Sequence, residues 1–141
     1  MRLKANGQQN LKQNKINKKF IYLISPNKIK NENFYTNLAL VLSSGKVSFF
    51  QLRLKKETSL NKLIIGKKIK KICKRYKVKF LINDEPLLAK KINADGCHLG
   101  QKDMDLIKAR KILKNKIIGV TCHNSIKLAK KAIAFGADYL A

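Results

Sequence analysis

The chain has 141 residues, of which 45% are hydrophobic, and a formal net charge of +24. This length predicts one domain or part of one, since domains typically have about 100–200 residues. The apolar content argues against a chain that is disordered throughout. No stretch approaches the roughly 18 apolar residues of a membrane-spanning helix, and no basic-then-apolar leader opens the chain. We therefore expect a soluble, cytoplasmic protein without a membrane partner.

The excess positive charge is almost entirely lysine. Only Arg2, Arg53, Arg75 and Arg110 are arginine, and lysine, asparagine and isoleucine are enriched along the full length. Basic faces bind the phosphates of nucleic acids. However, a bias spread over the whole chain is more typical of lysines that solvate helix faces. The sequence therefore disfavours nucleic acid as the partner and leaves part of the charge for a phosphate-bearing substrate.

Residues 1–19 predict a polar, basic tail or one loose helix ahead of a domain over 20–141. In that domain, short apolar runs of strand length alternate with stretches of helical spacing. The expected strands are 20–24, 47–53, 79–82, 94–99, 117–121 and 139–141, and the expected helices are 34–42, 60–76, 87–93, 104–113 and 126–135.

The order of these elements indicates an α/β protein with a parallel sheet. Short apolar strands without alternation are typical of parallel strands that are covered on both faces. A strand–helix unit repeated five times, with a sixth strand begun, permits a (β/α)8 barrel or a doubly wound open sheet. No GxGxxG motif follows the first strand, which disfavours the dinucleotide-binding form of the open sheet.

Polar side chains gather after four of the expected strands. These clusters are 51–55 (QLRLK), 83–84 (ND), 100–103 (GQKD) and 121–124 (TCHN). Both candidate folds place their active site at the carboxyl edge of the sheet. Five of the eight acidic residues also lie between positions 84 and 105. The sequence therefore predicts a functional site at this edge.

Two carboxylates beside basic side chains suit a magnesium ion that holds a diphosphate. Mg²⁺ prefers hard oxygen ligands and usually combines one or two carboxylates with substrate phosphates and waters. Asp84 and Asp103 would bind the ion, while Arg53 and Lys55 would neutralise the remaining phosphate charge.

Asn83 and Thr121 would supply neutral hydrogen bonds to phosphate oxygens or to a ring. Structural interpretations remain open beside the functional ones. Asp103 is placed to cap the following helix, and Asp84 could stabilise a helix start through the helix dipole. His98 is expected to be a hydrogen-bonded interior histidine rather than a catalytic one.

Six motifs occur in an order and spacing that resemble the thiamine phosphate synthase family. They are Tyr22-Leu23-Ile24, Gln51 to Lys55, Leu81 to Asp84, Ala94 to Met104, Ile118 to His123, and Gly136 to Leu140. The resemblance spans residues 20–141. Its most specific part is ADGCHLGQKDM at 94–104.

The resemblance implies a (β/α)8 TIM barrel, here only its first five and a half units. It implies a transferase of thiamine biosynthesis that joins hydroxymethylpyrimidine diphosphate to a thiazole phosphate and releases diphosphate. The diphosphate would leave with the help of Mg²⁺, a stabilised pyrimidine-methyl cation would form, and the thiazole nitrogen would attack it. No side-chain nucleophile is needed, in agreement with the lack of a convincing triad.

Carried over by motif, the substrate-binding residues would be Gln51, Leu52, Arg53, Leu54, Lys55, Asn83 and Thr121, with Asp84 and Asp103 holding Mg²⁺. Thr121 stands where the family usually has a serine. The family's loop after strand six and its strands seven and eight, which hold the thiazole phosphate, do not follow. We therefore expect a C-terminally incomplete chain that could be inactive alone, with a homo-oligomer left open.

Two other interpretations stay open. One is a thiazole tautomerase-like barrel enzyme, which shares the fold but uses no diphosphate; retention of Asp84 and Asp103 argues for the synthase instead. The other is a non-catalytic module that binds phosphate or nucleic acid.

Overall fold

The structure is a computed structural model that describes residues 20–141, so the tail or loose helix expected at 1–19 lies outside the described residues. Every expected strand and helix is confirmed, with bounds that differ from the expected ones by no more than two residues. The elements are β1 (Ile21–Ile24), α1 (Asn33–Ser43), β2 (Val47–Leu52), α2 (Ser59–Arg75), β3 (Lys79–Asn83), α3 (Pro86–Ile92), β4 (Gly96–Leu99), α4 (Leu106–Leu113), β5 (Ile117–Val120), α5 (Ile126–Ala134) and β6 (Tyr139–Leu140).

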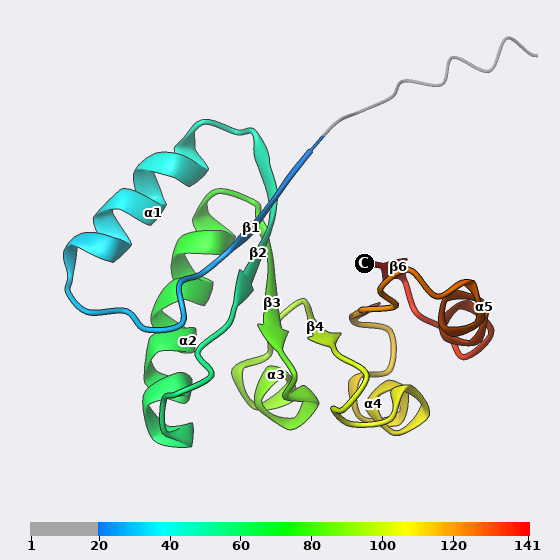
Figure 1. Cartoon of the computed structure of the whole chain (residues 1–141). Helices are drawn as coiled ribbons and strands as arrows, with labels where there is room; N and C mark the ends of the chain where they lie inside the picture. The colour runs from blue at the N-terminus through cyan, green and yellow to red at the C-terminus, as the bar shows by residue number, and fades with distance from the viewer. Residues whose placement is uncertain (1–19) are drawn as a thin grey trace, which may run out of the picture.

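The six strands form one parallel sheet whose strands follow one another in sequence order from β1 to β6. The helices follow one another around the outside of this curled sheet, from α1 to α5 (Figure 1). A doubly wound open sheet would instead reverse its strand order part-way. The fold is therefore a curled parallel half-barrel. Within residues 20–141, the outer edges of β1 and β6 have no strand partner.

Side chains at the helix starts explain where several helices begin. Thr58 accepts a hydrogen bond from a backbone N–H of α2, and Ser125 does the same for α5. Pro86 is the first residue of α3, where its missing N–H costs little. The expectation that Asp103 caps α4 is wrong, because Asp105 occupies the cap and accepts from two backbone N–H groups. Asp103 is therefore available for another role.

The two faces of the sheet differ in chemistry because successive strand residues point to opposite sides. The outer face packs against the helices and forms the apolar core, with Phe50, Phe80 and Ile69 at 0–1% exposure. The inner face carries polar and aromatic side chains. Gln51 on β2 and His98 on β4 are the buried examples.

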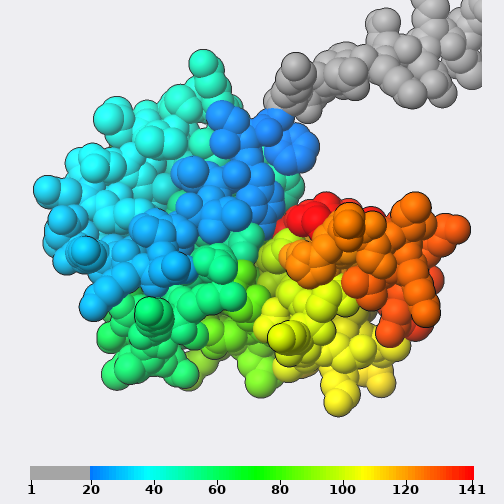
Figure 2. Space-filling model, viewed as in Figure 1, coloured from blue at the N-terminus to red at the C-terminus, as the bar shows by residue number. Residues whose placement is uncertain are grey.

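The first and last strands approach each other across the inner face. The hydroxyl oxygens of Tyr22 on β1 and Tyr139 on β6 are 2.7 Å apart. In the space-filling view, the first described residues (blue) and the last ones (red) accordingly lie next to each other (Figure 2). No helix among the described residues is long and apolar enough to cross a membrane.

Candidate active site

An open pocket of about 1170 Å³ occupies the inner face of the half-barrel and reaches the carboxyl ends of its strands. All six strands contribute to its wall. Seven of the nine residues that the sequence proposes line it: Gln51, Arg53, Lys55, Asn83, Asp84, Asp103 and Thr121. The curl of the sheet therefore brings four separate sequence clusters to one cavity.

Leu52 and Leu54 are the two proposed residues that do not line this pocket. Both side chains are buried in the apolar core, with 3% and 4% exposure. Their neighbours Gln51, Arg53 and Lys55 line the pocket, so the alternation of faces along β2 continues into the residues that follow it. The side chains of the two leucines thus pack in the apolar core, and their proposed role in substrate binding stays a prediction.

Asp84 and Asp103 come from the loops that follow β3 and β4. Asp84 has a positive φ of 63°, a backbone conformation that Asp and Asn tolerate better than most residues. Its N–H donates to the carbonyl of His98 at 2.8 Å. Asp103 accepts from the N–H of Gly100 at 2.6 Å. Contacts to β4 and its following loop therefore hold the two carboxylates next to each other.

Burial and a close neighbour both oppose ionisation of Asp84, which forms with Asp103 what we call the acid pair. Burial, and then the neighbouring Asp103, raise the pKa of Asp84 to about 6, while Lys55 and Arg53 act in the opposite direction. A carboxyl that shares its site with a second carboxyl resists ionisation unless a cation joins them. The pair is therefore a natural position for a divalent cation.

A magnesium ion fits this donor set. Within residues 20–141, no group of three or more His, Cys, Asp or Glu side chains is arranged to hold a metal. Mg²⁺ does not need such a group, because it commonly takes one or two carboxylates and completes its shell with phosphates and waters. Asp84 and Asp103 can provide these two carboxylates from the protein side.

A hydrogen-bonded chain of six side chains crosses the pocket from β5 to β3, and we call it the polar chain. The Thr121 hydroxyl contacts His98 Nε2 at 2.8 Å, and His98 Nδ1 contacts the Tyr139 hydroxyl at 2.8 Å. The Tyr139 hydroxyl contacts that of Tyr22. The remaining links run from Tyr22 to Gln51 Oε1 at 2.8 Å and from Gln51 Nε2 to Asn83 Oδ1. Its members therefore include three of the predicted site residues.

The other three members were not predicted as site residues. His98 is confirmed as a hydrogen-bonded interior histidine, but it also lines the pocket, as do Tyr22 and Tyr139. One signal was present in the sequence, because all three residues lie within the six motifs that resemble the family. The contact between Tyr22 and Tyr139 depends on the curl of the sheet, which no short motif encodes.

Burial keeps the members of the polar chain uncharged. It raises the pKa of Tyr22 to about 12 and also raises the pKa of Tyr139. Burial lowers the pKa of His98, with Asp103 opposing the shift. The imidazole at neutral pH therefore carries one N–H, and both phenols keep their hydrogens.

Comparison with known proteins agrees with this geometry. The family model described as thiamine monophosphate synthase matches residues 21–141. The chain belongs to this family. The half-barrel, the acid pair and the polar chain are thus features of a thiamine monophosphate synthase family member.

Two curated relatives and one solved structure illustrate the similarity. The chain is 86% identical over 131 residues to the thiamine-phosphate synthase of Pelagibacter ubique, covering 93% of this chain and 63% of the relative. It is 43% identical over 122 residues to the thiamine-phosphate synthase of Clostridium acetobutylicum, covering 85% of this chain and 57% of the relative. The thiamine phosphate pyrophosphorylase structure from Pyrococcus furiosus superposes with a TM-score of 0.76 at 32% identity. The superposition covers 89% of this chain and 60% of that structure's chain. The chain spans about 60% of the length of the relatives it matches.

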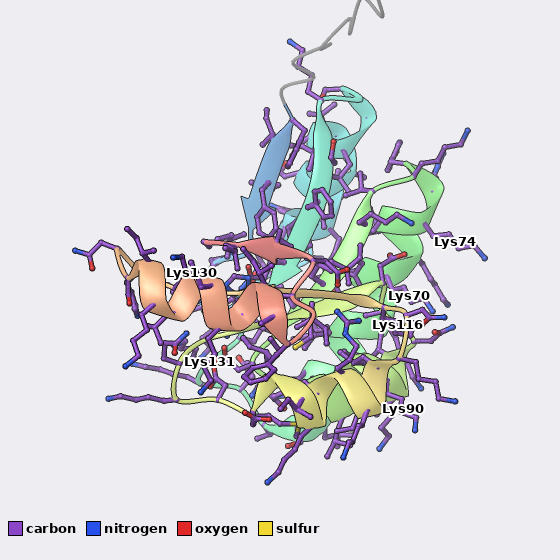
Figure 3. All side chains as sticks on the ribbon, turned by 90° about the vertical axis from the view of Figure 1, so that its right-hand side faces the viewer. Lys70, Lys74, Lys90, Lys116, Lys130 and Lys131 are labelled. Carbon is purple, nitrogen blue, oxygen red and sulfur yellow. The ribbon has the colours of Figure 1, made fainter. Side chains whose placement is uncertain are left out.

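A second hollow, of about 420 Å³, lies at the amino ends of β3 and β4, and we call it the lysine hollow. It is lined by Lys70, Lys74, Lys77, Val78, Lys79, Asn93, Ala94, Asp95 and Lys116. In the side view, Lys70, Lys74, Lys90 and Lys116 gather toward one end of the molecule, apart from Lys130 and Lys131 on α5 (Figure 3). The chain therefore has a strongly basic region away from its acid pair.

Proposed function

We propose that this chain carries the pyrimidine diphosphate half of a magnesium-dependent thiamine phosphate synthase site. The single observation that carries the proposal is the acid pair. Asp84 and Asp103 adjoin each other in a pocket that also contains Arg53 and Lys55. Two carboxylates that repel each other beside two cations form an arrangement suited to a metal ion and a diphosphate, and membership of the family agrees with it.

The substrate would be hydroxymethylpyrimidine diphosphate. Arg53 and Lys55 would bind its diphosphate, because guanidinium and ammonium groups form strong charge-assisted hydrogen bonds with phosphate oxygens. Gln51 and Asn83 would bind the pyrimidine ring through their amides. Thr121 would contact the same ligand from β5. These five side chains line the wall of a single pocket.

Asp84 and Asp103 would hold Mg²⁺, which when bound would neutralise charge on the departing diphosphate. The protein's own residues would orient the substrate and its leaving group. The bond from the pyrimidine methylene to the diphosphate oxygen would break, and a bond from that methylene to the thiazole nitrogen would form. Because the nucleophile is a second substrate, the site needs no nucleophilic side chain.

The thiazole phosphate and the complete (β/α)8 barrel belong to the whole protein in this proposal. The half-barrel supports a barrel because its strands follow sequence order and curl in one direction. The general phosphate site of such barrels lies after strands seven and eight. We therefore assign only the pyrimidine diphosphate and metal to the described residues.

Calorimetric titration with the pyrimidine diphosphate, with and without Mg²⁺, tests this proposal. The chain is compared with Asp84→Asn, which keeps the shape of the side chain and tolerates the positive φ. Asp105→Asn is the matched control, because it makes the same charge change at the cap of α4, and Asn is also a good cap.

We expect Mg²⁺-dependent binding in the unaltered chain and in Asp105→Asn, and loss of that binding in Asp84→Asn. Equal binding with and without Mg²⁺ would contradict the proposal. Salt-dependent retention on DNA without Mg²⁺-dependent diphosphate binding would favour a nucleic-acid module. Binding of a thiazole phosphate alone would favour the tautomerase-like alternative.

A further inference from the structure

The polar chain has a direction that can be worked out from its donors and acceptors. The Oε1 atom of Gln51 can only accept, so the Tyr22 hydroxyl must donate its single hydrogen to it. The Tyr22 oxygen must then accept from Tyr139. Since the Tyr139 hydrogen is now used, its oxygen must accept from Nδ1–H of His98. Every link therefore follows from the one before it.

The same reasoning continues to both ends. A neutral imidazole that carries its hydrogen on Nδ1 has a bare Nε2, which must accept from the Thr121 hydroxyl. At the other end, Gln51 donates through Nε2 to Oδ1 of Asn83. Thr121 can then face a ligand only as an acceptor. Asn83 faces it through the donor hydrogens of Nδ2.

We propose that His98 and Tyr139 are positioning residues that, through this directed hydrogen-bond chain, fix the orientation of the Gln51 and Asn83 amides for ring recognition. This inference rests on the proposed pyrimidine site. An unrestrained amide presents its oxygen or its nitrogen with little preference, because the two groups have nearly the same shape. The chain couples the two amides, so that they can turn over only together, and the tautomer of His98 then sets which way both face. A ring nitrogen that accepts a hydrogen bond thus suits Asn83.

Packing of the Tyr139 ring supports this role. A Cβ atom added at Gly119 would lie 1.9 Å from Cζ of Tyr139. The register places Asn83 beside His98, His98 beside Gly119, and Gly119 beside Tyr139. The missing side chain on β5 therefore makes the space that Tyr139 needs to reach both His98 and Tyr22.

The opposite direction is the only other way to satisfy every link. In it both amides turn over, Asn83 donates to Gln51, and Nε2–H of His98 donates to Thr121. The tautomer of His98 therefore distinguishes the two directions. The sequence contains only two histidines, His98 and His123, so the imidazole nitrogen spectrum of the ¹⁵N-labelled chain can be assigned with one His123→Gln variant.

The first experiment is this nitrogen spectrum of the ligand-free chain at neutral pH. We expect His98 in a single form with its hydrogen on Nδ1. A hydrogen on Nε2, or rapid exchange between both forms, would overturn the inferred direction.

The second experiment titrates Tyr139→Phe with the pyrimidine diphosphate and with inorganic diphosphate, each in the presence of Mg²⁺. We expect about tenfold weaker binding of the pyrimidine diphosphate, the usual scale of one lost hydrogen bond, with unchanged binding of inorganic diphosphate. Tyr35→Phe on α1 is the matched control, because its side chain lies outside the pocket. His98→Asn, which can still donate to Tyr139, should bind better than His98→Ala.

Three outcomes separate the two proposals. If the unaltered chain does not bind the pyrimidine diphosphate, both are overturned. If it binds and Tyr139→Phe binds equally well, only the positioning role is overturned. If Tyr139→Phe loses both ligands equally, the residue is structural and the positioning role is again overturned.

Discussion

The two ends of the half-barrel use charge in different ways. At the amino ends of the strands, several lysines of the lysine hollow are already engaged by the chain itself. Lys70 donates to the carbonyl of Ile92 at 3.1 Å, and Lys116 donates to Asn93 Oδ1 at 2.7 Å and to the carbonyl of Ala94. Lys70 thereby satisfies the last carbonyl of α3, a common role for lysine, and Lys116 binds the two residues that follow the helix.

At the carboxyl ends, the acid pair has the opposite character. Burial, and then crowding by Asp103, raise the pKa of Asp84 to about 6. The lysine hollow contains more charged side chains, and three of its five lysines have partners within the chain: Lys70 and Lys116 on oxygen atoms near the end of α3, and Lys79 on Asp95 at 3.4 Å. The comparison shows that two adjacent, partly buried carboxylates, rather than the amount of charge, mark the candidate site in a chain with a net charge of +24.

The largest expected effect is on diphosphate binding, and it distinguishes the acid pair from the lysine hollow. Asp103→Asn should weaken Mg²⁺-dependent diphosphate binding by about 100-fold, since a charged contact in such a site is worth about 1.5–3 kcal/mol. The double change Lys74→Gln, Lys77→Gln in the lysine hollow should leave the Mg²⁺-dependent affinity for diphosphate within about twofold of that of the unaltered chain. Titration of both variants at one ionic strength measures this difference. A larger loss from the lysine changes would reverse our assignment of the two ends.

The pH dependence should follow from the raised pKa of Asp84. Its folded pKa, about 6, lies above the value of about 3.9 for an unfolded Asp. The folded chain therefore binds more protons between these values, and its free energy of unfolding should fall as pH rises through them.

Thermal unfolding in the absence of Mg²⁺ measures this dependence. Asp84→Asn should flatten the decrease between pH 4 and 6 and raise the melting temperature at pH 7. In the unaltered chain, Mg²⁺ should bind more weakly below about pH 6, as protons compete for Asp84. A melting temperature that is lower in Asp84→Asn at pH 7 would contradict the crowding of the two carboxylates.

The substitution Gly119→Ala tests the polar chain by displacing the ring of Tyr139. The added methyl group would meet the Tyr139 ring at 1.9 Å, so the ring must move. We expect about 1–3 kcal/mol of destabilisation, as for other overpacked sites, together with weaker pyrimidine diphosphate binding. Denaturant unfolding and titration measure the two effects. Unchanged binding would show that the position of Tyr139 does not matter to the ligand.

The smallest expected effect concerns the lysine hollow. Lys116→Met keeps most of the side-chain length but removes its hydrogen bonds to the end of α3. We expect about 1 kcal/mol of lost stability, the usual net value for a hydrogen bond, and no change in Mg²⁺-dependent diphosphate binding. Denaturant unfolding measures the loss of stability. A change in binding without a change in stability would point to a ligand role for this hollow.

Local patterns in the sequence were sufficient for the elements and for the edge of the sheet that carries the site. Apolar runs predicted each strand, and polar residues after four strands predicted one cluster. Strand alternation also explains why the Leu52 side chain turns to the apolar core while Gln51 turns to the pocket. The cap of α4 was misplaced because Asp103 and Asp105 are both suitable residues, and only the backbone geometry of the loop decides between them.

The polar chain could not be predicted in the same way. Tyr22 and Tyr139 are 117 residues apart in sequence, and their contact requires the accumulated curl of six strands. A change in curl would separate them without altering any motif. Tyr22, His98 and Tyr139 all lie within the six motifs, but their contacts with one another depend on long-range geometry. The site residues that were predicted follow from short-range pattern.

Replacement of Mg²⁺ by paramagnetic Mn²⁺ tests the central claim most directly, because Mn²⁺ also prefers oxygen ligands and broadens the amide signals of nearby residues. With diphosphate present, our account predicts broadening at 83–84 and 100–103 in the unaltered chain and its loss in Asp84→Asn. Broadening centred on Asp95 and the lysine hollow would contradict it, and would place the metal at the opposite end of the half-barrel.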